Sequence, residues 1–272
     1  MLRTRVIVAV ILLPIGLTII YFGGWAFTAF VVLILGLAAW EYSKIFRVTG
    51  FEPASVIAIA GAAMLALGRG WNSFDSAPWM ISLIVIISMI YHMVAYERGR
   101  DNAGTDFAIT LSAALYPGWL GAYLISIRAL PEGFWWLLLV LPCVWLADSG
   151  AYFIGRSFGK HKLSPRLSPK KTWEGYLGGI VVGTLGAIGL VYLWSIWAGP
   201  AFSITPIQGA LLGFLLSSIT TLGDLGESMI KRQSGVKDSS NLIPGHGGVF
   251  DRIDSWLWAA LIGYYFIIWI VG

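Results

Sequence analysis

The chain has 272 residues, of which 57% are hydrophobic and only 12% are charged. A soluble domain is about a quarter charged, so this composition excludes a soluble enzyme and a disordered chain. The single cysteine excludes an intrachain disulfide framework and a cysteine-based zinc site. The net charge of +4 is small and the basic residues lie in short loops, so we expect no nucleic-acid partner.

Nine segments are apolar over about 20 residues, the length that a membrane-spanning helix needs. The first follows Arg3 and Arg5 and precedes no small-residue cleavage site, which predicts a retained helix rather than a signal peptide. Pro117 and Gly118 predict a kink or break in the fifth. The predicted fold is all-α, a polytopic membrane protein with about nine spans at roughly 5–22, 25–46, 54–70, 78–96, 106–127, 133–155, 176–198, 206–230 and 255–271.

The basic residues predict the orientation of these spans. With nine spans, 16 of the 18 lysines and arginines fall on the side of the N-terminus, and only Arg69 and Arg128 fall on the other. The positive-inside rule then places the N-terminus and both long polar loops, 156–175 and 231–254, in the cytoplasm. We divide the chain into an N-terminal membrane region, 1–130, and a C-terminal catalytic region, 131–272. In the first region, Glu41 and His92 lie near helix ends, and we interpret them as marking the membrane interface.

Acidic residues within the later spans point to a site. Asp148 lies inside the sixth span, and Asp224 and Glu227 lie in the last turns of the eighth. A carboxylate in a spanning helix is unfavourable, so it usually faces a cavity, a partner or an ion. Asp224, Glu227 and Ser228 have the i, i+3, i+4 spacing that places three oxygens on one helix face. Such a face suits Mg²⁺, although a proton or salt-bridge relay without metal fits the spacing as well.

The loop 231–254 combines basic side chains with glycines and acids. Residues 244–248, Pro-Gly-His-Gly-Gly, predict a tight turn whose backbone N–H groups can approach an anion. Asp251 and Asp254 follow at the entrance to the last helix. These residue types predict a site for phosphates and a metal. The alternative is a positively charged loop that is merely solvated.

The loop 156–175 carries a second basic cluster, directly before the seventh span. Lys170 and Lys171 are placed to reach phosphates at that helix start. Thr172 is a predicted N-cap, with Glu174 in the first turn, which is a structural role. Two basic loops beside acid-bearing helices predict a polyphosphate substrate that binds at the membrane surface.

The stretch from Ser228 to Asp254 resembles the signature of the phosphatidate cytidylyltransferases, or CDP-diacylglycerol synthases. That signature runs S-x-apolar-K-R, four residues, K-D, a small residue, and then P-x-H-G-G-apolar-x-D-R-apolar-D. It is matched here by Ser228, Lys231, Arg232, Lys237, Asp238, Ser240, Pro244, His246, Gly247, Gly248, Asp251, Arg252 and Asp254. The segment 148–175, with its S-P-K-K-T-x-E-G, is also similar to the family, so the resemblance covers about residues 140–272.

The resemblance implies a multi-pass enzyme of the bacterial cytoplasmic (inner) membrane that works on the lipid bilayer with its active site facing the cytoplasm. It would convert CTP and phosphatidate to CDP-diacylglycerol and pyrophosphate, with Mg²⁺, a possible second cation such as K⁺, and a homodimeric state.

On this basis we assign roles to the residues. Asp224 and Asp251 are the assigned metal ligands, supported by Glu227, Asp254 and Asp148. His246 either positions the leaving pyrophosphate or only shapes the turn. The groups assigned to phosphate and substrate binding are Lys231, Arg232, Lys237, Arg252, Lys170, Lys171, Ser168, Thr172, Ser228, Gly247 and Gly248.

Three other functions fit parts of the sequence. A cation-coupled transporter would also carry intramembrane acids, but these acids lie at helix ends and no inverted repeat is evident. A CTP-dependent kinase of a polyprenol-like lipid would release CDP instead of pyrophosphate. A scaffolding protein would have no use for two loops rich in phosphate-binding side chains.

Overall fold

The computed structural model describes the backbone of residues 2–272 and the side chains of residues 8 and 10–272. The side chains of Arg3 and Arg5, which we use to orient the first span, lie outside the described residues. The structure is helical apart from one small hairpin, so the predicted all-α class is confirmed. Within the described chain, seven helices are long and apolar enough to cross a membrane, which fits a polytopic membrane protein. The count of nine spans and their orientation stay predictions.

The chain divides into two compact units. The first comprises residues 1–129 and 230–253, and the second comprises residues 130–229 and 254–272. The first boundary lies beside the division that we draw at residue 130, but the structure groups residues 230–253 with the N-terminal helices.

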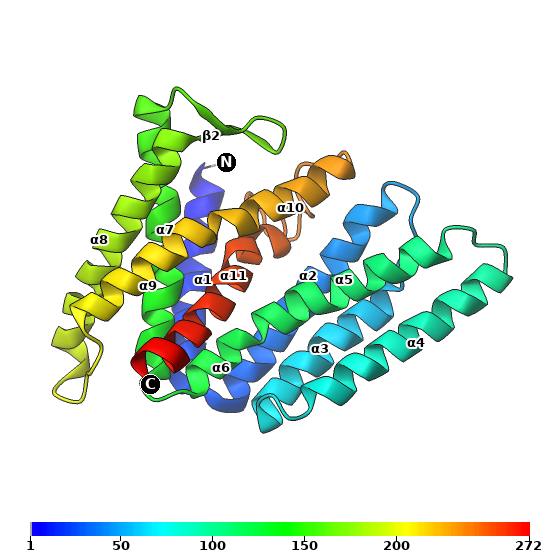
Figure 1. The fold of residues 1–272 in the computed structure, drawn as a ribbon, viewed down its shortest axis with the longest axis horizontal. Helices are drawn as coiled ribbons and strands as arrows, with labels where there is room; N and C mark the ends of the chain where they lie inside the picture. Colours follow the sequence, from blue (N-terminus) through cyan, green and yellow to red (C-terminus); the bar gives the residue numbers. More distant parts are fainter. Residues whose placement is uncertain (1) are drawn as a thin grey trace. The chain divides into compact units, whose positions relative to one another are not determined.

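Six helices form the N-terminal part of the first unit. In this unit α2, α3 and α5 pack against one another, and α4 packs on α3 and α5 (Figure 1). Helix α5 continues through Pro117 and Gly118, so it does not break where the sequence predicts, and the single turn residue Ala122 separates α5 from α6. The helices are α1 (Leu2–Phe22), α2 (Gly24–Arg47), α3 (Ser55–Asn72), α4 (Ala77–Glu97), α5 (Ala103–Gly121) and α6 (Tyr123–Ala129).

In the second unit, α7 (Gly133–Phe158), α8 (Trp173–Ala198) and α9 (Pro206–Ile219) pack closely (Figure 1). Gly175, Gly179 and Gly183 stand four residues apart on α8, and a Cβ on Gly179 would lie 2.9 Å from the carbonyl oxygen of Ala147 on α7. Small residues at this spacing let membrane helices approach each other. The chain then continues into α10 (Thr221–Gln233), α11 (Phe250–Phe266) and the π-helical turn η1 (Ile267–Val271).

The predicted loop 156–175 contains an antiparallel hairpin, which its residue pattern does not predict. Strand β1 (Lys162–Ser164) pairs with β2 (Ser168–Thr172), with Lys162 opposite Thr172 and Ser164 opposite Ser168. Helix α7 extends to Phe158, beyond the expected end of its span. The hairpin ends where α8 begins, so it fixes the position of its lysines relative to that helix.

Candidate functional site: a carboxylate cluster and a basic segment

Three carboxylates converge in the second unit. Asp224 and Glu227 come from α10 and Asp254 comes from the first turns of α11. One oxygen of each lies within 4.8 Å of the others, and Glu227 is only 2% exposed. Three carboxylate oxygens this close repel one another unless a cation balances them. We call Asp224, Glu227 and Asp254 the carboxylate triad.

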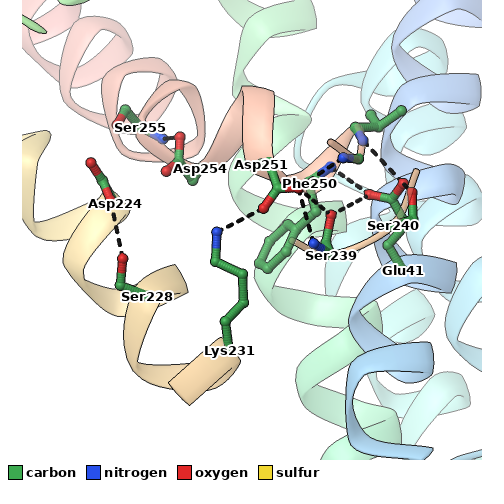
Figure 2. Close-up of polar contacts among 12 residues, drawn as sticks. Glu41, Asp224, Ser228, Lys231, Ser239, Ser240, Phe250, Asp251, Asp254 and Ser255 are labelled. Carbon is green, nitrogen blue, oxygen red and sulfur yellow. Dashed lines mark hydrogen bonds and ion pairs between the residues drawn. The ribbon is translucent and has the colours of Figure 1, made fainter. Parts of the chain in front are cut away.

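Two further groups lie beside Asp224, one from its own helix and one from the hairpin. The Ser228 hydroxyl donates to Asp224 Oδ1 at 3.3 Å, so the i, i+4 spacing places both side chains on one face of α10 (Figure 2). The ammonium of Lys171, on β2, lies 2.6 Å from Asp224 Oδ2. A lysine cation therefore stands beside the triad, supplied by the hairpin.

The donor set of the triad fits a hard divalent cation. Magnesium prefers carboxylate oxygens and keeps several waters, so it needs only a few protein ligands. The triad offers three such oxygens from two helices, with Asp224 and Asp254 partly exposed and Glu227 buried. Asp148, which we expect to support this set, is exposed and does not belong to the triad.

Asp251 belongs to a different cluster, in the first unit. Its Oδ1 accepts from Lys231 Nζ at 2.7 Å, and its Oδ2 accepts from the backbone N–H of Gly248 at 2.8 Å. The backbone N–H of Ser239 donates to Oδ2 at 3.0 Å, and the Ser239 hydroxyl, whose one hydrogen is shared with a second carboxylate, also lies 3.0 Å from Oδ2. Four donors thus occupy a carboxylate that we assign to a metal. This geometry favours a role for Asp251 in ordering the segment 231–252, which we call the basic segment after Lys231, Arg232, Lys237 and Arg252.

Glu41, which we interpret from the sequence as marking the membrane interface, is part of this second cluster. Glu41 of α2 is fully buried, and its Oε1 accepts from the Ser240 hydroxyl at 2.5 Å and from the Val249 N–H at 3.0 Å. Its Oε2 accepts from the Ser239 hydroxyl at 3.1 Å and from the Phe250 N–H at 2.6 Å (Figure 2). These partners follow about 200 residues later, so no local pattern reveals them.

The predicted tight turn at residues 244–248 is present. The His246 N–H donates to the Ile243 carbonyl at 2.9 Å, and Gly245 has a φ of 77°, as the third residue of a type II turn requires. Ile243 and Gly247 form an isolated bridge that closes the turn. The orphaned, buried Nδ1 of His246 has no hydrogen-bond partner among the described residues.

The last two residues of this turn, Gly247 and Gly248, leave room for two carboxylates of the protein itself. A Cβ on Gly247 would lie 2.5 Å from Asp251 Oδ2, and a Cβ on Gly248 would lie 2.5 Å from both oxygens of Glu41. The sequence predicts that these glycines let backbone N–H groups approach an anion. The anions that approach them here are Asp251 and Glu41.

Of the remaining predicted residues, some lie in β2 or at the start of α8, and the others have exposed side chains. Thr172 is the N-cap of α8 and accepts from the Gly175 N–H at 3.2 Å, which confirms its predicted structural role, and Glu174 lies in the first turn. Ser168 begins β2 and is partly exposed. The side chains of Lys170, Arg232, Lys237 and Arg252 are exposed, as cations that bind a soluble phosphate would be.

A family model described as the cytidylyltransferase family matches residues 3–270. The chain belongs to this family. It is therefore a nucleotidyltransferase enzyme. A phosphatidate cytidylyltransferase from Pseudomonas aeruginosa is 39% identical over all of this chain and 98% of its own length. The Synechocystis enzyme of the same name is 34% identical over 97% of this chain and 96% of its own length. A third, from Staphylococcus saprophyticus, is 32% identical over 94% and 95% respectively.

The two clusters contain the residue types that nucleotidyl transfer uses. Nucleotidyl transfer needs negative charge on a triphosphate to be neutralised and its phosphates to be positioned. The second unit contains the three converging carboxylates, and the first contains the exposed side chains of Arg232, Lys237 and Arg252. The family match covers both units, so it extends the resemblance seen at residues 140–272 over almost the whole chain.

Proposed function

We propose that this chain transfers the cytidylyl group of CTP to phosphatidate, giving CDP-diacylglycerol and pyrophosphate. The names of the full-length relatives support this substrate pair. The observation that carries the proposal is the carboxylate triad, because a membrane cytidylyltransferase needs a cation at a triphosphate.

The triad would hold Mg²⁺ through Asp224, Glu227 and Asp254. When bound, the ion would neutralise phosphate charge and act as a Lewis acid on the nucleotide. Asp251 stays outside this ligand set in our proposal, since its oxygens already accept from Lys231, Ser239 and Gly248. A second, monovalent cation such as K⁺ remains an expectation from the family.

The basic side chains would bind the phosphates of CTP and the phosphate of the lipid. Lys231, whose ammonium bonds Asp251, is held in place for this contact. Lys171 pairs with Asp224 at 2.6 Å and would neutralise charge beside the triad. Lys170, Arg232, Lys237 and Arg252 are exposed to the solvent from which CTP arrives.

The reaction needs no strong general base, because the phosphatidate phosphate is already an anionic nucleophile. One of its oxygens attacks the α-phosphorus of CTP, a new phosphorus–oxygen bond forms, and the bond from the α-phosphorus to the bridging oxygen of the β-phosphate breaks. The electron pair leaves with pyrophosphate. Catalysis then rests on positioning and charge neutralisation. His246, which is partly exposed, would contact the leaving group.

The membrane setting follows from the helices. The acyl chains of phosphatidate would remain in the bilayer while its phosphate reaches the polar residues. We propose that the site opens to the cytoplasm of a bacterium, across its inner membrane, because 16 of 18 basic residues fall on that side of the predicted topology. The homodimeric state of the family is proposed for this chain as well.

The test is the fate of a label. Purified protein in detergent receives phosphatidate, Mg²⁺ and CTP with ³²P at the α-phosphate. We expect label in the lipid fraction and unlabelled pyrophosphate in the water. Label that stays in water-soluble CDP would replace our proposal with phosphoryl transfer to a lipid, and no turnover in a folded preparation would favour a transporter.

A further inference from the structure

Glu41 is an unusual residue for its position. It lies in α2 (Gly24–Arg47), a helix apolar enough to span a membrane, and none of its surface is exposed. A carboxylate in such a place is unfavourable unless its oxygens are hydrogen bonded. Its four donors come from residues 239–250, so the bonding partners of this acid are all in the basic segment.

Two of the donors are backbone N–H groups at the start of α11. The first N–H groups of a helix have no partner within it, and its N-terminus carries partial positive charge. Val249 and Phe250 donate to Glu41, while the preceding N–H, of Gly248, donates to Asp251. Three consecutive N–H groups are thus bound by two carboxylates. Glu41 caps α11 from a distant helix.

Ser239 links Glu41 to Asp251, and Asp251 bonds Lys231, whose ammonium would bind phosphate. The Ser239 hydroxyl lies 3.1 Å from Glu41 Oε2 and 3.0 Å from Asp251 Oδ2. Asp251 in turn bonds Lys231 Nζ at 2.7 Å. A chain of contacts therefore runs from α2 through Ser239 and Asp251 to Lys231 (Figure 2).

We propose that Glu41 is a positioning residue for the reaction. It holds the basic segment in the conformation that presents Lys231 and the 243–247 turn to phosphates, and it touches no substrate itself, because it is fully buried. The inference rests on the proposed function for its catalytic consequence. The structural part of the proposal is that Glu41 orders residues 239–250, and hydrogen exchange tests this part without an activity assay.

Glu41→Gln is the sharpest perturbation because it keeps the size of the side chain. Each carboxylate oxygen of Glu41 receives one serine hydroxyl and one backbone N–H. A hydroxyl can rotate and accept from the new NH₂ group, but a backbone N–H cannot accept. Whichever way the amide turns, it places NH₂ against the N–H of either Val249 or Phe250.

Two measurements test the proposal. We expect kcat per folded enzyme to fall on the order of 100-fold in Glu41→Gln, as small misplacements of a site do. Hydrogen–deuterium exchange at residues 245–252 should rise roughly tenfold, because a buried hydrogen bond is lost locally. The matched control is Ser43→Ala, since Ser43 is also buried on α2 but its hydroxyl bonds, among the described residues, only the Ala39 carbonyl of its own helix.

The outcomes separate positioning from bulk stability. Faster exchange confined to residues 237–252, together with a lower kcat, supports the proposal. Exchange that rises equally in all helices overturns it, and so does a kcat within about threefold of the parent protein. If Glu41→Gln does not fold, Ser240→Ala removes the 2.5 Å contact instead, and unchanged exchange at 245–252 in that variant overturns it. If the parent makes no CDP-diacylglycerol, the proposed function fails while the exchange data still decide the role of Glu41.

Discussion

Asp251→Asn tests whether the basic segment is held by a buried ion pair. In the parent protein, Asp251 and Lys231 pair at 2.7 Å with side chains only 4% and 13% exposed. Solvent therefore screens this pair little, unlike a surface salt bridge. The asparagine keeps the shape of the side chain but places a neutral amide against the ammonium.

The expected magnitude follows from that burial. Removing one partner of a buried pair typically destabilises a protein by about 3–5 kcal/mol, because the other charge stays buried without its counter-charge. Replacing both partners with neutral groups costs much less. We therefore expect Asp251→Asn to lose about 3–5 kcal/mol and Lys231→Met/Asp251→Asn to recover most of that loss.

The assay is reversible unfolding in mixed micelles of dodecylmaltoside and SDS, on the parent, both single variants and the double variant. The coupling free energy of the cycle should lie well above the roughly 0.5 kcal/mol within which independent sites add. Additive variants, or an Asp251→Asn protein within about 1 kcal/mol of the parent, would refute the idea that this pair orders the segment.

Three further predictions address other contacts. Asp224→Asn should weaken Mn²⁺ binding at least about tenfold in spin-resonance titrations without substrate, and the exposed Asp75→Asn should not. Gly248→Ala should lower kcat on the order of 100-fold, because its Cβ would meet Glu41, whereas Gly104→Ala meets nothing within 4 Å. Arg69→Ala should destabilise the protein by about 2 kcal/mol, since its guanidinium lies 3.5 Å from the Phe74 ring centroid, while kcat/KM per folded enzyme stays unchanged. An unaltered Mn²⁺ affinity, a normal Gly248→Ala rate, or a large loss of activity in Arg69→Ala would each contradict the account.

Local patterns in the sequence predict much of this structure. Runs of apolar residues mark the helices, and the i, i+4 spacing of Asp224 and Ser228 places their side chains in contact. Thr172 caps α8, as its position before a helix predicts. These features depend on neighbours within a few residues, which is the range that a single sequence reveals.

Features that depend on distant partners are not predicted. Glu41 looks like an interfacial acid because its donors lie 198–209 residues further along the chain. Asp251 and Asp254 are three residues apart, yet one accepts from Lys231 and the other joins the triad. The hairpin that brings Lys171 to Asp224 has too few residues and too polar a sequence to give a strand signal.

The central claim is that the carboxylate triad holds the metal for cytidylyl transfer. It is tested most directly by the rate of CDP-diacylglycerol formation as a function of Mg²⁺ concentration in the parent, Asp254→Asn and Asp251→Asn. We predict that the half-saturating Mg²⁺ concentration rises at least about tenfold in Asp254→Asn and stays unchanged in Asp251→Asn, whose rate is lower at every concentration. A parental Mg²⁺ dependence in Asp254→Asn, or a shift confined to Asp251→Asn, would contradict the account.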